Sequence, residues 1–157
     1  MNTMFTSKVL LTLYKQLPRA IRENENGVLR AAKCGFHTRG TDNTLRLMEK
    51  ILSKNNEKID MINLKLLIDK AFNLMLAEDI RIINMRFIKG LRFIEMASEL
   101  DISLRQAFRV YDRAVESFYN QLEYLKYPAE RIERDFGHLS IYQATCFRLS
   151  NEYGRLD

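Results

Sequence analysis

Hydrophobic residues recur every three or four positions along most of this chain, which is the spacing of amphipathic helices. With only 6 Gly and 2 Pro in 157 residues, the pattern predicts an all-α protein. The first apolar stripe precedes Pro18, which ends or redirects its helix. The stripe is too short to span a bilayer, so we expect it to dock against the rest of the protein. It comprises Met4, Val9, Leu10, Leu13, Tyr14 and Leu17.

The segment from Arg19 to Gly40 is the least regular part of the pattern, because asparagine and glycine residues punctuate it. Its basic side chains are Arg19, Arg22, Arg30, Lys33 and Arg39. They leave two interpretations open, a solvated connector or a basic arm that touches phosphates. The connector is the favoured interpretation, since charged runs are usually solvated.

Two helical stretches are predicted next, separated by the polar pair Asn55–Asn56. Thr41 or Asp42 can cap the first stretch. We expect a helical hairpin that serves as core or as an oligomer interface, so that a homodimer is possible. The apolar positions are Leu45, Met48, Ile51 and Leu52, then Ile59, Ile62, Leu66, Phe72 and Met75.

The stretch from Glu78 to Glu116 predicts three helices joined by tight turns. Gly90 fits the left-handed position after the first helix, and Ala97 gives the second helix a small side chain where helices cross. The turn Asp101–Ser103 follows, and the Ser103 hydroxyl can cap the third helix. The second helix is apolar at Leu91, Phe93, Ile94, Met96 and Leu100. This order is typical of a helix-turn-helix, whose last helix enters a DNA groove.

The third helix of this unit carries the candidate DNA-reading residues. At about 100° per residue, Arg105, Arg109 and Arg113 share an arc of about 80°, with Gln106 beside it. Arginine can donate two hydrogen bonds to guanine, and glutamine can pair with adenine. Glu116 interrupts the basic stripe, so we expect base contacts only in the first turns.

The opposite side of the same helix is apolar and is predicted to face the core. This side comprises Ala107, Val110, Tyr111, Ala114 and Phe118. A further apolar flank widens it beyond what a three-helix unit needs, so we expect that flank to pack the N-terminal helices or a second subunit. The flank comprises Leu104, Phe108, Val115 and Leu122. After Pro128, one or two short amphipathic helices are predicted around Gly137, with apolar positions at Ile132, Phe136, Leu139, Tyr142, Cys146, Phe147 and Leu149.

From Leu76 to Leu122 the sequence resembles region 4 of bacterial sigma factors, and more closely the sigma-like small phage activators of the ArpU/RinA type. The matching residues are Arg86-Phe87, Phe93, Glu95-Met96-Ala97, Leu100, Ile102-Ser103 and Arg113-Ala114. The chain departs from that pattern at Arg92, Asp101, Leu104 and Ala107. The resemblance covers about a third of the chain. It implies binding of double-stranded DNA through the third helix and work alongside RNA polymerase.

Composition and charge narrow the possible functions. The net charge is +5, and it is uneven: residues 1–76 hold 13 Lys/Arg against 7 Asp/Glu, or +6, while residues 77–157 hold 12 against 13, or −1. Any phosphate affinity is therefore expected from the first half. Two cysteines are too few for a disulfide framework, and Cys34, His37, His138 and Cys146 are too scattered to predict a zinc site. No phosphate loop, catalytic carboxylate pair or nucleophile triad is recognisable, so neither an enzyme nor a cofactor is predicted.

These observations together predict a cytoplasmic DNA-binding transcription regulator of sigma-like type, encoded by a phage or prophage according to the resemblance. Its expected parts are an N-terminal helical region (1–76), a helix-turn-helix domain (77–127) and a C-terminal helical tail (128–157). The expected DNA-contacting residues are Arg92, Ser103, Leu104, Arg105, Gln106, Arg109 and Arg113. Two alternatives stay open: a small terminase subunit, and an adaptor that binds proteins instead of DNA.

Overall fold

The computed structural model describes residues 3–35 and 41–153, and in these ranges every regular element is a helix. The all-α prediction is therefore confirmed. In chain order the elements are α1 (Thr3–Tyr14), α2 (Leu17–Gly35), α3 (Thr41–Leu74), α4 (Ala77–Ile83), the π-helical turn η1 (Asn84–Ile88), α5 (Phe93–Leu100), α6 (Leu104–Tyr124), α7 (Ala129–Phe136) and α8 (Ser140–Tyr153). No helix within these ranges is long and apolar enough to cross a membrane.

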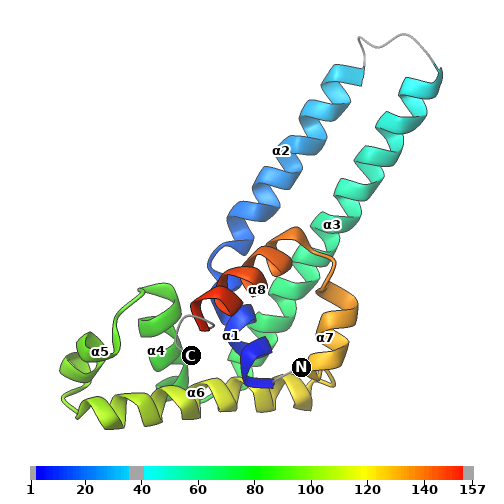
Figure 1. Ribbon diagram of the computed structural model, residues 1–157. Helices are drawn as coiled ribbons and strands as arrows, with labels where there is room; N and C mark the ends of the chain where they lie inside the picture. The colour runs from blue at the N-terminus through cyan, green and yellow to red at the C-terminus, as the bar shows by residue number, and fades with distance from the viewer. Residues whose placement is uncertain (1–2, 36–40, 154–157) are drawn as a thin grey trace.

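Helix α6 connects two parts of the molecule (Figure 1). Its first half packs against α4 and α5, and its second half packs against α1 and α3. The apolar face predicted for this helix is buried at Ala107, Tyr111, Ala114 and Phe118. One continuous helix, Leu104–Tyr124, therefore belongs to both parts and connects the three-helix unit to the rest of the protein.

Helix α1 forms the centre of the core, as its apolar stripe predicted. Its leucines are fully buried, and it lies among α3, α6 and α8. The Tyr14 hydroxyl donates a 2.6 Å hydrogen bond to Asp69 of α3, and the Tyr14 ring meets Phe72 edge-on at 5.1 Å. Pro18 lies in the first turn of α2, where its fixed φ and missing N–H are tolerated. The chain is thereby redirected between α1 and α2.

Helices α2 and α3 form a long antiparallel arm that rises away from the other helices (Figure 1). The connector predicted from Arg19 to Gly40 is wrong over its described part, because residues 17–35 are helical. The hairpin predicted around Asn55–Asn56 is also wrong, because α3 runs without a break from Thr41 to Leu74. The true hairpin joins α2 to α3 through residues 36–40, which lie outside the described residues. The proposed cap by Thr41 or Asp42 also falls on side chains outside that description.

Polar contacts and one small residue hold the arm together. Asn24 donates a hydrogen bond to Glu57 at 3.3 Å, and Lys58 pairs with Glu25 at 3.0 Å. A Cβ on Gly27 would lie 3.2 Å from the Lys54 ammonium, so the absence of a side chain allows the close approach. Asparagine and glycine have low helix propensity, and a glycine inside a helix costs about 1 kcal/mol relative to alanine. These contacts with α3 offset that cost.

The C-terminal segment folds as two short helices around Gly137, as predicted. Ile132 and Tyr142 are fully buried against the core, whereas Phe147 is 72% exposed. His138 lies 2.9 Å from Asp60, and Ser140 donates a 2.9 Å hydrogen bond to Glu57. Both contacts tie the α7–α8 corner to the middle of α3, at the base of the arm.

Candidate nucleic-acid interface

A tight turn sets the direction in which α6 leaves α5. Asp101 ends α5 in the left-handed conformation, with φ of 53°, and the Ile102 N–H donates to the Ala97 carbonyl at 3.0 Å. Aspartate tolerates this conformation better than most residues because its short side chain can bond locally. Ala97 is buried, and the close approach of two helices at this residue stays a prediction.

Ser103 caps α6 as predicted, and Gln106 completes the cap. The Ser103 hydroxyl accepts the Gln106 N–H at 3.2 Å, and the Gln106 side-chain oxygen accepts the Ser103 N–H at 2.9 Å. This reciprocal arrangement is a capping box. Bidentate pairing with adenine needs both the amide oxygen and the amide nitrogen of a glutamine. While the cap is closed, the Gln106 amide nitrogen is free to donate, but one lone pair of its oxygen and the orientation of the amide are fixed by Ser103.

The three arginines of α6 have different environments. Arg105 and Arg109 are exposed, and neither guanidinium is engaged in an ion pair or hydrogen bond with another described residue. Arg113 instead lies 3.5 Å from Asp79 of α4, whose side chain is only 6% exposed. Arg113 therefore neutralises a buried carboxylate, and the free cations of this face are Arg105 and Arg109.

Arg92 precedes α5 and is engaged by Glu95. The Glu95 carboxylate accepts the Arg92 backbone N–H at 2.7 Å and its guanidinium at 3.1 Å. These hydrogen bonds, the backbone one first, hold the pKa of Glu95 below its usual range. Since the guanidinium is 75% exposed, it can still turn towards a phosphate if it gives up Glu95.

The predicted apolar flank of α6 is divided between core and surface. Val115 and Leu122 are fully buried, as predicted, whereas Leu104 and Phe108 are 46% and 45% exposed. The Phe108 ring packs on Phe93 at 4.3 Å between centroids. Of the two alternatives expected for this flank, packing within the chain applies to Val115 and Leu122, and packing of Leu104 and Phe108 against a second subunit stays a prediction.

An aromatic and cationic cluster supports that surface, and the sequence pattern alone did not reveal it. The Arg86 guanidinium lies 4.5 Å from the centroid of the Phe93 ring and donates a hydrogen bond to the Leu91 carbonyl at 2.8 Å. Phe93 also meets Tyr111 edge-on at 5.0 Å. The only sequence signal was the aromatic pair at Phe93 and Phe108, which lie on different helices.

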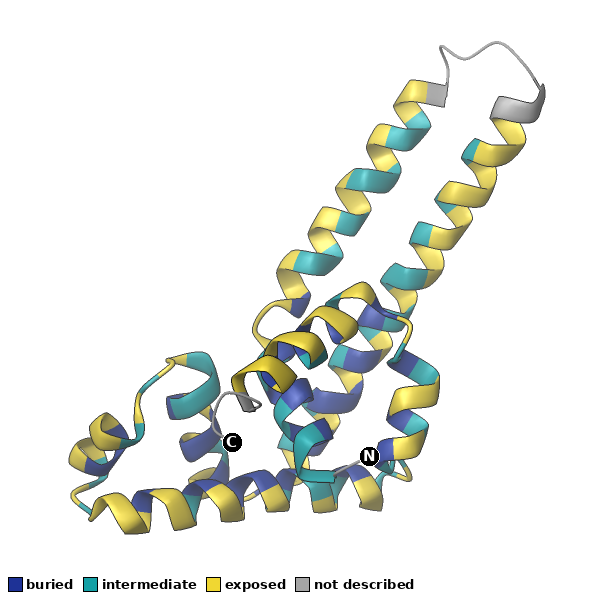
Figure 2. Ribbon diagram, in the orientation of Figure 1, coloured by how far each residue is buried: buried dark blue, intermediate teal, exposed yellow. Residues whose placement is uncertain are grey.

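The basic residues of the segment from Arg19 to Gly40, where described, lie elsewhere, although Lys8 of α1 lies 5.7 Å from the Tyr111 ring of α6. Arg22, Arg30 and Lys33 are exposed on α2, and Arg19 is paired with Glu23 at 2.7 Å. Arg39 lies outside the described residues. Figure 2 shows that the exposed edge of α6 faces away from the side on which the arm rises. The basic face of α2 and the free arginines of α6 therefore do not form one continuous surface.

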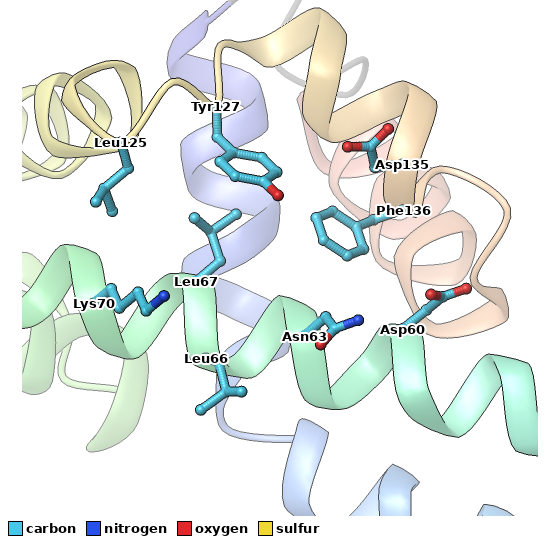
Figure 3. Close-up of a pocket in the computed structure, with 9 residues that line it drawn as sticks. All are labelled: Asp60, Asn63, Leu66, Leu67, Lys70, Leu125, Tyr127, Asp135 and Phe136. Atoms are coloured by element: carbon cyan, nitrogen blue, oxygen red, sulfur yellow. The ribbon is translucent and has the colours of Figure 1, made fainter.

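A groove of about 620 Å³ lies between α3 and the α6–α7 corner (Figure 3). Tyr127 and Phe136 form its apolar wall, and Asp60 and Asp135 lie at its rim. The Arg134 and Arg131 guanidinium groups hold the pKa of Asp135 below its usual range. Across the described ranges no cluster of three or more His, Cys, Asp or Glu side chains could hold a metal, and Cys34 and Cys146 are both free.

Comparisons of the chain with models of known protein families, with curated proteins and with solved structures found no match.

Proposed function

We propose that this protein binds double-stranded DNA through the first two turns of α6. The observation that carries the proposal is the pair of free guanidinium groups, Arg105 and Arg109, on the exposed side of a helix whose opposite side is buried. A guanidinium without an internal partner can donate two hydrogen bonds to guanine in the major groove. Arg92 flanks this face and would contact a phosphate.

The proposed biological role is that of a sequence-specific transcription regulator of sigma-like, helix-turn-helix type. It rests on the resemblance of residues 76–122 to sigma region 4, and so do the proposed phage origin and a contact with RNA polymerase. The order α4, α5, three-residue turn, α6 is compatible with that class. Leu104 and Phe108 add apolar surface beside the arginines, and such side chains can contact thymine methyl groups.

Selection from random duplexes, followed by binding measurements across salt concentration, tests this proposal. We expect one enriched sequence and an affinity that falls as salt rises, because phosphate contacts release counterions. Absence of salt-dependent binding to any duplex would eliminate the proposal.

On the selected duplex, Arg109→Ala should weaken binding by about 1–3 kcal/mol, or roughly 5- to 150-fold, if Arg109 contacts a base. Arg30→Ala is the matched control, because Arg30 is an exposed arginine on α2, in the arm that rises away from α6 (Figure 1). If both variants bind the duplex as tightly as the wild type, Arg109 makes no base contact and is a solvated surface residue.

A protein-binding adaptor is the second candidate, and one observation favours it. Ile94, Leu104 and Phe108 leave large apolar side chains exposed on α5 and α6, at 64%, 46% and 45%. Ion pairs such as Arg92–Glu95 and Lys89–Glu99 also compensate much of the charge around them. If the duplex selection fails, this apolar surface is the place to look for a protein partner.

A further inference from the structure

Helix α3 carries large apolar side chains on a side of the arm that faces solvent. Leu45, Leu52, Ile59 and Leu66 are 60%, 60%, 53% and 51% exposed, and Met48 is 55% exposed. The first four follow one another at intervals of seven residues. Singly exposed leucines are common on protein surfaces, but a regular row of them along one helix is not.

This row lies apart from the α2-facing side and the core-facing side of α3, and its members Leu52 and Leu66 border open hollows on the side towards α7 and α8. The α2-facing side includes Lys54, Glu57 and Lys58, and the core-facing side includes Met61, Leu64 and Ile68. At about 100° per residue, the centre of the row lies roughly 160° around the helix from each of these sides. Figure 3 shows the end of the row, where Leu67 points towards Tyr127 and Leu66 projects from the other side of α3.

A seven-residue repeat is the period of a left-handed coiled coil. In a coiled coil, the residue three positions after each member of such a row also faces the partner helix. We call the row and these residues together the α3 seam, which comprises Leu45, Met48, Leu52, Asn55, Ile59, Ile62 and Leu66. The α3 seam covers three heptads and about 32 Å of helix, which is the minimum length for a recognisable coiled coil. On a straight helix such a row drifts by about 20° per heptad, so it pairs fully only with a helix that supercoils around it.

The chemistry of the α3 seam fits a second copy of the same helix. On one side it is flanked by Glu49, Asn56 and Asn63, which carry a single charge among them. On the other side Lys58 and Lys65 are already paired within the chain, with Glu25 and Asp69 respectively. No row of like charges therefore opposes self-association. Asn55 is the single polar member, and a polar residue at one seam position commonly fixes the register of a coiled coil.

The position of Asn55 distinguishes the possible alignments. In a parallel, in-register pair, Asn55 meets Asn55 of the second copy, and the two amides can hydrogen-bond to each other. In the antiparallel alignment with the fullest overlap, the same amide faces Ile59 and loses its partners. Because an unpaired polar group in an apolar seam is unfavourable, the parallel alignment is preferred.

We propose that the α3 seam is a homodimer interface, in which the arms of two copies pair in parallel and in register. The projected contact strip, about 32 Å long and about 11 Å wide, is roughly 350 Å². This footprint is small beside the roughly 800 Å² per partner of standard interfaces. The dimer should therefore dissociate on dilution.

Sedimentation equilibrium of the full chain over a range of concentrations tests the dimer. We expect the mass to rise from 18.6 kDa towards about twice that value. The double variant Leu52→Glu/Ile59→Glu should remain at the monomer mass at concentrations where the wild type is mostly dimeric. Both side chains are exposed within one copy, so the helical circular dichroism should be unchanged.

The control variant is Ser53→Glu, which adds an acidic residue to the same helix outside the α3 seam. It should dimerise like the wild type. A wild type that stays monomeric at all concentrations would overturn the proposal, as would a double variant that dimerises normally or a mass well beyond that of a dimer.

Cysteine cross-linking tests the alignment independently. In a chain with Cys34→Ser and Cys146→Ser, the variant Asn55→Cys should form a covalent dimer on mild oxidation, whereas Ser53→Cys should not. A non-covalent dimer of the wild type without cross-linking at position 55 would overturn the parallel, in-register alignment. This result does not depend on whether the protein binds DNA.

Discussion

Asp79 is a buried carboxylate whose nearest cation belongs to another helix. It is 4% exposed in the first turn of α4, where the positive end of the helix dipole favours a negative charge. Its Oδ1 atom has no hydrogen-bond partner, and Arg113 approaches it at 3.5 Å from α6. This ion pair therefore joins the first and last helices of the three-helix unit.

Removal of Arg113 should destabilise the protein because it leaves a buried charge unpaired. We expect Arg113→Ala to lower the free energy of unfolding by about 1–2 kcal/mol, a reduced value because the guanidinium is 60% exposed. Urea denaturation measures this change. Arg105→Ala, which removes an unpaired guanidinium, should change stability by less than about 0.5 kcal/mol. In an Asp79→Asn background the effect of Arg113→Ala should shrink, and an undiminished effect would contradict the pairing.

Two residues of the three-helix unit, Gly90 and Asp101, have backbone angles in the left-handed region. We expect substitutions at these two positions to change the stability in opposite directions. Gly90 has φ of 72° and open space where a Cβ would lie, so Gly90→Ala adds only backbone strain and should cost about 1–2 kcal/mol. Asp101 has φ of 53°, so Asp101→Gly relieves strain and should stabilise by roughly 0.5–1 kcal/mol, after the entropy of the unfolded chain is subtracted. Thermal unfolding of both variants checks the signs. A stability loss in Asp101→Gly would show that its side chain contributes more than its strain costs.

At the scale of whole elements, one hydrogen bond couples α1 to α3. Burial, and then the hydrogen bond to Asp69, raise the pKa of Tyr14 to about 12. Burial by itself would raise the pKa of Asp69, but hydrogen bonds from Lys65 and Tyr14 outweigh it and lower that pKa. The bond thus requires a neutral Tyr14 and an ionised Asp69.

The stability from this bond should depend on pH at the alkaline end. Because the folded-state pKa of Tyr14 lies above the usual value of about 10, its contribution is complete below about pH 10 and is lost as pH rises through about 12. Tyr14→Phe should lower the free energy of unfolding by about 0.5–1.5 kcal/mol at neutral pH. The difference from the wild type should then disappear between pH 10 and 12. A difference that persists at pH 12 would exclude the hydrogen bond as its source.

Helical periodicity predicted those elements whose apolar faces are buried. The buried faces of α1 and α6 and the pair of helices around Gly137 followed from spacing alone. The arm did not, because Gly27 and the nearby asparagines are local helix breakers that contacts with α3 override. Helical spacing predicted that Arg113 lies on the same face as Arg109. It did not predict that Arg113 is paired with Asp79, because Asp79 lies on another helix. Such long-range pairings are not encoded in the period of one element.

Over the whole molecule, most of the basic residues of the first half are spread along the arm, while Lys8 and Lys15 of the α1 region lie near Tyr111 and Ile88. Arg22, Arg30 and Lys33 lie on α2, and the arm rises on the side away from the exposed edge of α6 (Figure 2). The sequence led us to expect that these residues anchor the phosphates of the duplex that α6 reads. In the folded chain, one straight duplex lying along α6 would not meet both surfaces.

The salt dependence of DNA binding shows whether the basic residues of α2 contact the phosphates of the duplex that α6 binds. For the triple variant Arg22→Ala/Arg30→Ala/Lys33→Ala, we expect the slope of log K against log salt on a short duplex to equal that of the wild type. If all three side chains touched phosphates, the slope would fall in magnitude by about 2.7, or about 0.9 for each lost contact. Arg92→Ala, beside the reading face, should instead reduce it by up to about 0.9. A reduced slope in the triple variant would mean that the DNA bends towards the arm, or that the arm of a second copy reaches it.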